Sequence, residues 1–264
     1  MSKVRERIER QANLVLQYLE ELGAESSYRG IERLVQLVLQ SLLDLGLMVI
    51  SATGGGQVET YRSVGVELYR LGVLNKEYSD FMVEATGMRN ILVHGYARVN
   101  PRIVMKAARE ELPDKVAEIV ARIRSAVEKL NIDPELPSKG LSEVFKGRVK
   151  VAFLFGSRVK GYTFKGDYDF AVYFGREYTL RELGRLVVDL SAFLGVPMEK
   201  VDVVVLDNAP PSIVLEAVSG TPVYYEDAYT LFEVRYTLMR DALDIIWAEK
   251  FQSSILREKY LGER

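Results

Sequence analysis

The hydrophobic positions of the first 130 residues repeat with the period of an α-helix. Apolar residues recur every three or four positions in five stretches, and no stretch before residue 149 alternates with period two. Glycine-rich and Asn-Pro sequences separate these stretches, most clearly SATGGGQ at 51–57. The pattern therefore predicts an all-α half with helices over 4–22, 30–51, 61–72, about 77–94 and 103–130.

The pattern changes after a short linker. NIDPELPSKG (131–140) contains two prolines and a glycine, which is typical of a connection between domains. Beyond it, the runs VKVAFLF, DYDFAVYF, VDVVVL and TPVYYE predict strands, the last at a sheet edge, and helices are expected over 179–195, 211–219 and 228–258. The predicted fold class is α plus α/β. Its parts are a helical domain over 1–131, a linker over 132–140 and a small domain with a long C-terminal helix over 141–264.

Composition narrows the functional classes. Of the 264 residues, 48% are hydrophobic and none is cysteine, so a core is expected, whereas disulfides, zinc–thiolate sites and thiol nucleophiles are excluded. The 35 Lys and Arg against 37 Asp and Glu give a net charge of −2, which predicts no broad basic face, although a local groove for nucleic acid stays compatible. The charged N-terminus and the polar residues that interrupt the longest apolar stretch predict neither a signal peptide nor a membrane span. We expect a cytoplasmic protein.

FLFGSRVKGYTFKGDYDFAVYF (153–174) carries the most specific chemical signal. A hydrophobic strand ends before Gly156 and Ser157, whose tight turn can cradle a phosphate with backbone amides and a hydroxyl. Asp167 and Asp169 lie two residues apart in the next strand, so both carboxylates share one face. Paired carboxylates of this kind suit divalent cations that prefer oxygen ligands.

A third carboxylate completes the pattern. Asp202 opens the strand VDVVVL, and Asp207 at the far end of that strand is the alternative. Together, the G-S turn, the D-x-D and the third aspartate resemble the DNA-polymerase-beta-like nucleotidyltransferase superfamily. The G-S-x-x-x-G form, completed by Gly161, is similar to the minimal nucleotidyltransferases. The chain departs from their usual form at Gly166, where a serine commonly precedes the D-x-D.

This resemblance implies a mixed sheet, ATP as substrate and Mg²⁺ as cofactor. The triphosphate would be held by Gly156, Ser157, Lys160 and Gly161. Two magnesium ions would be bound by Asp167, Asp169 and Asp202. Such an ion pair stabilises the attacking and leaving oxygens of an in-line transfer.

MRNILVHGY (88–96) contains the only histidine of the chain. It reads R-N-x-x-x-H-x-Y near the predicted end of a helix, and its motif residues are Arg89, Asn90, His94 and Tyr96. A lone histidine is more often a packing residue. However, residues 4–130 resemble HEPN domains, helical bundles with an R-x4–6-H motif, and the members that pair with minimal nucleotidyltransferases carry R-x4-H-x-Y. The presence of the partner domain in the same chain favours the functional interpretation.

The second resemblance implies a metal-independent ribonuclease that works as a homodimer. His94 would act as general acid or base for attack of a 2′-OH on the adjacent phosphorus of RNA. Arg89 would hold the charge on the phosphoryl oxygens, and Asn90, one turn from His94, would position it or the phosphate. In related toxin–antitoxin pairs the nucleotidyltransferase transfers AMP from ATP to the motif tyrosine, here Tyr96, and silences the ribonuclease.

Two alternatives stay open. The transferase could act on another molecule, with the helical half as a substrate-binding and dimerisation module, as in kanamycin-type nucleotidyltransferases. The chain could also be an inert dimeric scaffold, against which the intact G-S, D-x-D and R-x4-H sets argue.

Overall fold

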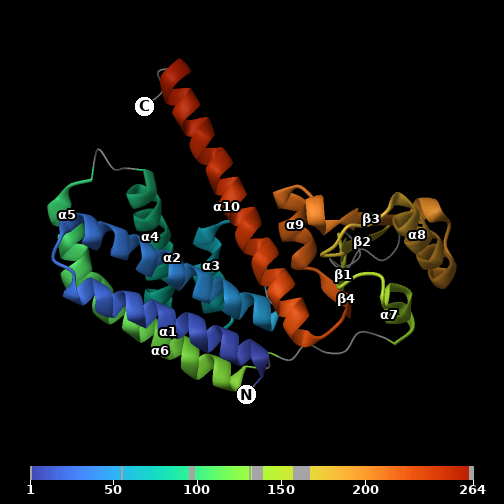
Figure 1. The fold of residues 1–264 in the computed structure, drawn as a ribbon, viewed down its shortest axis with the longest axis horizontal. Coiled ribbons are helices and arrows are strands. Elements are labelled where there is room, and N and C mark those ends of the chain that lie inside the picture. Colours follow the sequence, from blue (N-terminus) through green and yellow to red (C-terminus); the bar gives the residue numbers. More distant parts are fainter. Residues whose placement is uncertain are drawn as a thin grey trace. The chain divides into compact units, whose positions relative to one another are not determined.

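The computed structural model describes residues 2–54, 56–94, 99–130, 132, 139–156 and 167–261, with the side chains of His94, Lys139 and parts of the last helix left out. The chain divides into two compact units, Met1–Asp133 and Pro134–Arg264 (Figure 1). The predicted linker falls largely outside the described residues.

The described residues of the N-terminal unit form helices and connecting turns and no strand, as predicted. Its α-helices are α1 (Lys3–Ala24), α2 (Tyr28–Thr53), α3 (Tyr61–Arg70), α4 (Lys76–His94), α5 (Pro101–Lys106) and α6 (Leu112–Lys129). Ser2, Ser27 and Asn100 accept hydrogen bonds from the first free backbone N–H groups of α1, α2 and α5, and Gly54 ends α2 in the left-handed conformation.

Helix α2 is the core of this unit. Side chains such as Val38, Leu39 and Leu42 are fully buried, and α2 contacts each of the other five helices. By length and composition alone α2 passes as a possible membrane span, contrary to the expectation that its polar residues exclude one. Its apolar composition has a different cause, because 78% of its most apolar window is buried inside the protein.

The single helix predicted over 103–130 is wrong in one respect. A π-helical turn, Ala107–Glu111, separates α5 from α6. Pro113 explains the break, because proline has no N–H to donate and its ring clashes with the carbonyl four residues earlier in a regular α-helix. The wider turn closes instead through the N–H of Leu112, which donates to the carbonyl of Ala107 five residues back.

The C-terminal unit is built on a four-stranded sheet. Its elements are α7 (Lys139–Phe145), β1 (Val151–Phe155), β2 (Tyr168–Tyr173), α8 (Leu180–Leu194), β3 (Val201–Val205), α9 (Pro211–Val218), β4 (Thr221–Tyr225) and α10 (Ala228–Leu261). The strand order is β3-β2-β1-β4, with β1 antiparallel to β2 and β4, and β2 parallel to β3. The sheet is therefore mixed, β4 is an edge strand, and the last helix is long, all as predicted. Pro222 lies in the edge strand beside an irregularity in register, where a missing N–H is tolerated.

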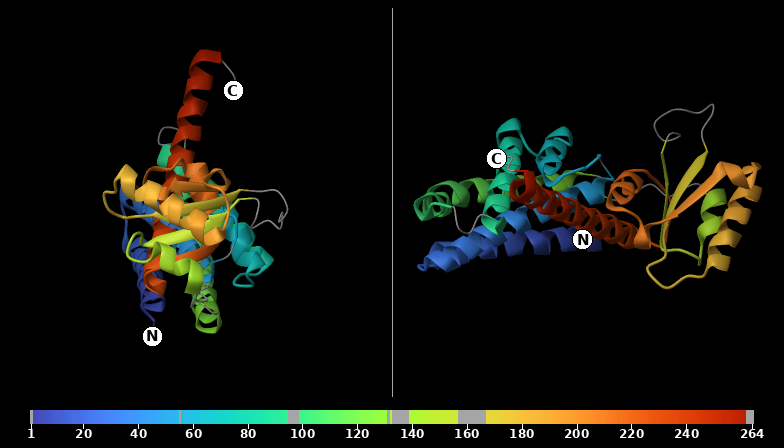
Figure 2. Two further views of the ribbon diagram at one scale, coloured as in Figure 1. Left: turned by 90° about the vertical axis from the view of Figure 1, so that its right-hand side faces the viewer. Right: turned by 90° about the horizontal axis from the view of Figure 1, so that it is seen from above.

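A different pair of helices lies on each face of this sheet. Helices α7 and α8 lie on one face, where Phe170 and Val172 of β2 pack with Leu186 and Leu190 of α8 (Figure 1). Helices α9 and α10 lie on the other side and contact β1, and α10 also contacts β4 (Figure 2). Strands β2 and β3 therefore carry their polar side chains on the face turned away from α8.

Candidate active sites

Two of the predicted carboxylates lie side by side on the sheet. Asp169 of β2 and Asp202 of β3 are direct register partners in the parallel pair. Phe170 and Val203, their neighbours along each strand, pack toward α8, so alternation places both aspartates on the opposite face. Asp169 is half-buried and Asp202 is exposed to solvent.

Gly156 brings the backbone of the turn after β1 against one of these carboxylates. Its φ is +74°, in the left-handed region, and its neighbour Phe155 is the register partner of Asp169. A Cβ atom at Gly156 would lie 2.3 Å from Oδ2 and 2.9 Å from Cγ of Asp169. Only glycine permits both this conformation and this approach. The other predicted phosphate-binding residues, Ser157, Lys160 and Gly161, lie outside the described residues, as does Gly166.

Asp167 comes directly before β2 and lies on the same face as Asp169 by its spacing. Its Oδ1 accepts a hydrogen bond from Nζ of Lys200, at 2.7 Å, across the gap to the start of β3. Within the described ranges, no three acidic or histidine side chains are grouped to hold one metal ion. The donors themselves fit Mg²⁺, since all are carboxylate oxygens on adjacent strands. Binding through all three carboxylates would require Asp167 to exchange Lys200 for the ion.

Asp207, the alternative third carboxylate, has a structural role in a turn. It lies in the short 3-10 turn after β3, and its two oxygens accept hydrogen bonds from the backbone N–H groups of Phe174 (2.9 Å) and Gly175 (2.8 Å). These groups belong to the turn at the far end of β2 from Asp169. Asp207 therefore holds that turn, and Asp202 is the carboxylate placed beside Asp169.

Arg89 of the helical unit is buried and held by several partners. Arg89 lies on α4 and is only 9% exposed. The Nε donates to Oε1 of Gln40 at 2.8 Å, an Nη donates to Oδ1 of Asn90 at 3.2 Å, and the guanidinium carbon lies 5.3 Å from the ring centre of Tyr61. The guanidinium is thus fixed in direction before any ligand binds.

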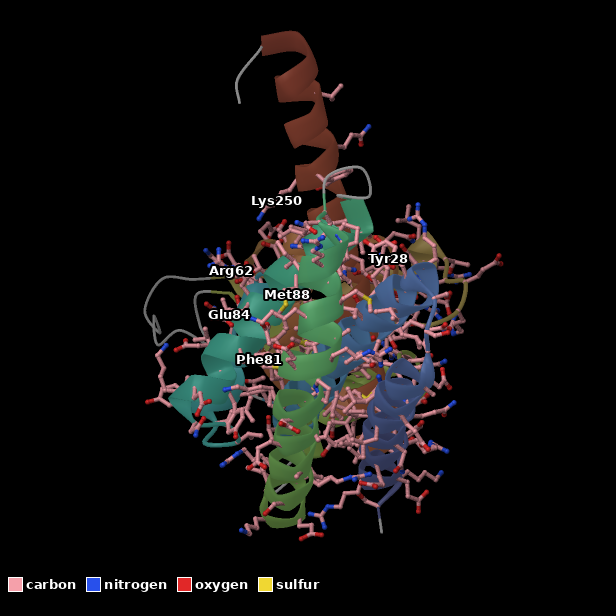
Figure 3. All side chains as sticks on the ribbon, turned by 90° about the vertical axis from the view of Figure 1, so that its left-hand side faces the viewer. Tyr28, Arg62, Phe81, Glu84, Met88 and Lys250 are labelled. Atoms are coloured by element: carbon pink, nitrogen blue, oxygen red, sulfur yellow. The ribbon has the colours of Figure 1, made fainter. Side chains whose placement is uncertain are left out.

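Helix α4 extends through His94, so the whole R-x4-H motif lies on one helix. Five residues of α-helix correspond to a rotation of about 140° and a rise of about 7.5 Å between the backbone positions of Arg89 and His94. Asn90 lies one turn from His94 on the same side. The side chain of His94 and all of Tyr96 lie outside the described residues. Figure 3 shows this side of the unit, with Met88, the residue before Arg89, labelled on α4.

Sequence reasoning missed the residues that hold Arg89. Gln40 belongs to α2, 49 positions earlier in the chain, and Tyr61 begins α3. The only signal in the sequence was a polar residue interrupting the apolar stripe of α2, which indicates nothing about its partner.

The described site residues are a motif arginine held within a helical bundle and two aspartates paired on a mixed sheet beside a glycine turn. Family comparison agrees in both halves. Residues 5–123 match the family described as Ribonuclease HepT-like, and residues 139–229 match the family described as Polymerase beta, Nucleotidyltransferase. Each half of the chain therefore matches one of these two families.

Individual relatives are similar to parts of the chain. A protein named Putative RNase from Archaeoglobus fulgidus is 28% identical over 92 residues, 35% of this chain and 68% of that protein. A tRNA nuclease HepT from Aphanizomenon flos-aquae is 32% identical over 76 residues, 29% of this chain, and the match spans about half (52%) of that relative's length. The solved structure of YutE from Bacillus subtilis, a cytosolic protein of unknown function, superposes with a TM-score of 0.44 at 18% identity, covering 47% of this chain and 91% of that one.

Proposed function

We propose that the chain is a self-silencing ribonuclease, in which the C-terminal unit transfers AMP from ATP to Tyr96 of the N-terminal unit. The observation that carries the proposal is the occurrence of both families in one polypeptide, the first with an R-x4-H-x-Y motif and the second with Asp169 and Asp202 in register. Because the transferase and the nuclease are parts of one polypeptide, the transferase always has a protein substrate in the same molecule.

The transfer step joins a phenol to a phosphate. The Tyr96 oxygen attacks the α-phosphorus of ATP, a new O–P bond forms, and the bond from that phosphorus to the bridging oxygen of the β-phosphate breaks, releasing pyrophosphate. The phenolic proton passes to solvent or to a carboxylate at the site. Asp167, Asp169 and Asp202 would hold Mg²⁺, which supplies charge neutralisation for the triphosphate. The backbone at Gly156 would contact the phosphates beside Asp169.

The silenced reaction is cleavage of RNA. A 2′-OH attacks the adjacent phosphorus, and the bond to the 5′-oxygen of the next nucleotide breaks, leaving a cyclic phosphate. His94 would take or give a proton at these oxygens, and Arg89 would stabilise the charge on the phosphoryl group. The printed name of one relative, a tRNA nuclease, makes tRNA the first substrate to test.

The coupling between the two reactions is electrostatic and steric. Tyr96 is two residues beyond His94 and seven beyond Arg89. An adenylyl phosphate on Tyr96 would place a negative charge beside the cations that otherwise bind the RNA phosphate. Modification would therefore compete with substrate for the same residues.

Intact mass measurement after incubation with ATP and Mg²⁺ tests the proposal. The expected result is a gain of one or more AMP units, mapped to Tyr96 by peptide mass, together with loss of tRNA cleavage. Turnover of ATP with transfer to an added small molecule, and no label on the chain, would favour the alternative in which the helical unit only binds substrate. A chain inactive in both assays would leave only the scaffold interpretation.

A further inference from the structure

Two glutamines of α2 face the end of α4 that carries the R-x4-H motif. Gln36 and Gln40 are one helical turn apart, so their side chains leave α2 on the same side. Gln36 is 8% exposed and Gln40 is half-buried, in a helix whose other inward positions are mostly apolar. Burying an amide is unfavourable unless its donors and acceptors form hydrogen bonds. The hydrogen-bond partners of Gln36 and Gln40 therefore indicate what each glutamine does.

The hydrogen-bond partners of the Gln40 amide determine which of its ends is the oxygen and which is the nitrogen. Its Oε1 accepts from Nε of Arg89 at 2.8 Å, and its Nε2 donates to Oδ1 of Asp44 at 3.0 Å. A guanidinium can only donate and a carboxylate can only accept, so the reverse orientation of the amide would break both bonds. Gln40 therefore links Arg89 to α2 through a neutral group, and its Nε2 is bonded to the carboxylate of Asp44.

Gln36 holds the backbone near the end of the same helix. Its Nε2 donates to the carbonyl of Leu92 at 2.8 Å, and its Oε1 accepts from Arg33 at 3.3 Å. The last four carbonyls of α4 have no N–H partner within the helix, and Leu92 is among them. The side chain of Gln36 thus fixes the last turn of α4, two residues before His94.

We propose that Gln36 and Gln40 are positioning residues for RNA cleavage, Gln36 for the turn that bears His94 and Gln40 for Arg89. The inference rests on the proposed nuclease function of Arg89 and His94. A neutral acceptor at position 40 fixes the direction of the guanidinium without neutralising the charge that stabilises the phosphoryl oxygens. A glutamate in the same place would hold Arg89 equally well and would cancel that charge.

The double variant Gln40→Glu with Asp44→Asn tests the role of the neutral acceptor. It keeps the net charge and the hydrogen-bond chain, because the new amide at position 44 can donate to the new carboxylate at position 40, which can accept from Arg89. The negative charge moves from position 44 to position 40, whose side chain bonds Nε of Arg89. We expect the kcat of tRNA cleavage to fall by about a hundredfold with little loss of thermal stability. The single variant Asp44→Asn isolates the effect at position 44, so the remaining difference belongs to position 40.

The variant Gln36→Leu tests the fixing of the helix end, and Gln11→Leu is its matched control. Gln11 is also a buried glutamine, 6% exposed, and its Nε2 donates to a helix carbonyl, that of Ser41, at 3.1 Å. Both variants lose one buried hydrogen bond, and Gln36→Leu also loses the longer, part-buried bond from Arg33, so their melting temperatures should fall by similar amounts. Only Gln36→Leu should lower kcat, by about ten- to a hundredfold, with KM little changed.

All measurements use the chain of 264 residues, with intact mass showing that no AMP is attached. If the parent cleaves tRNA and the double variant cleaves it equally fast, the role of Gln40 is overturned. If Gln36→Leu and Gln11→Leu lower kcat equally, the role of Gln36 is overturned and only a structural bond is left. If the parent and its Arg89→Ala and His94→Ala variants behave alike toward RNA, the proposed nuclease itself fails, and this inference fails with it.

Discussion

Gly156 and Gly147 have nearly the same backbone conformation, with φ of +74° and +72°, but different surroundings. A Cβ at Gly156 would lie 2.3 Å from Oδ2 of Asp169, whereas a Cβ at Gly147 would meet nothing within 4 Å. A left-handed non-glycine residue costs about 1–2 kcal/mol at either position. Gly156→Ala alone would also displace the carboxylate, so the two variants separate backbone strain from damage to the site.

We expect Gly156→Ala to slow nucleotide transfer by about a hundredfold or more, because a shift of an ångström in a reacting group has effects of that size. Gly147→Ala should lose comparable thermal stability and keep the parent rate. The measurement is the rate of labelling by radioactive ATP, next to a melting curve for each variant. Equal rates for the two variants would remove the reason for placing Asp169 at the transfer site.

Lys200 and Asp167 make a different residue-scale prediction, because their ion pair competes with a metal ion for the same carboxylate. Both side chains are partly exposed, at 55% and 40%, so the pair contributes about 0.2–1 kcal/mol. Lys200→Met should therefore lower the Mg²⁺ concentration for half-maximal transfer by up to about fivefold. Lys146→Met, which breaks the exposed pair with Glu143, is the control. An increased Mg²⁺ requirement in Lys200→Met would show that the lysine assists the reaction.

Residue-scale chemistry was predictable where it depended on spacing along one strand or helix. The common face of Asp167 and Asp169 follows from their separation of two. The sequence favoured Asp202 and left Asp207 as the alternative, because spacing alone does not tell which strand pairs with β2 and in which register. The role of Gln40 was not predicted, since its partner Arg89 is distant in sequence and contacts it only through packing of α2 on α4.

At the scale of elements, α8 owes its start to a capping box that is sensitive to pH. The Thr179 hydroxyl accepts from the N–H of Glu182, and the Glu182 carboxylate accepts from the N–H of Thr179. The bond from the Thr179 N–H is the main cause of a lowered pKa for Glu182, with a further contribution from Arg176. A lowered carboxyl pKa contributes stability above its unfolded value of about 4.3, and that stability is lost as pH falls through the folded value.

We expect Glu182→Gln to be less stable than the parent at pH 7, since the amide is a weaker acceptor and carries no charge at the helix N-terminus. The difference should shrink as the pH falls from about 5 to 3. Urea unfolding of both chains across this range is the measurement. A difference that stays constant with pH would mean that the Glu182 carboxylate is not protonated at a lowered pKa in the folded chain.

Element types were predictable from period, whereas interruptions were not. The long C-terminal helix and the edge strand with Pro222 were both expected and both are present. The π-turn at Ala107–Glu111 was not expected, although its cause, Pro113, is visible in the sequence. A proline inside a helical pattern can end, kink or widen the helix, and neighbouring contacts decide which of these occurs.

At the scale of the whole molecule, the position of Arg89 bears on assembly. One chain directs Arg89 into its own bundle and carries His94 about 140° around the same helix. A second copy would supply another histidine, so that an acid and a base could act on one phosphate. We expect a dimer by light scattering at micromolar concentration, and loss of tRNA cleavage on dilution below its dissociation constant. A monomeric chain that still cleaves tRNA would contradict this expectation.

The last prediction joins the two units through Tyr96. If the transferase silences the nuclease, Asp167→Ala should leave the chain unlabelled by ATP and active on tRNA, because it loses a carboxylate of the transfer site and nothing in the helical unit. Adding His94→Ala should then abolish the cleavage, since loss of general acid–base help typically slows a reaction about 10²–10⁴-fold. The matched measurements are intact mass and tRNA cleavage on the same preparations.

Tyr96→Phe separates the acceptor from the transferase. Phenylalanine keeps the ring but offers no oxygen nucleophile, so the variant should take up no AMP and should continue to cleave tRNA in the presence of ATP. Its transferase site is unchanged, and it should therefore label the tyrosine of an added Asp167→Ala chain if transfer runs between protomers. Should Tyr96→Phe take up AMP as readily as the parent, with the label mapped to another residue, Tyr96 is not the acceptor. Self-silencing at the motif would then be rejected in favour of a transferase with another target.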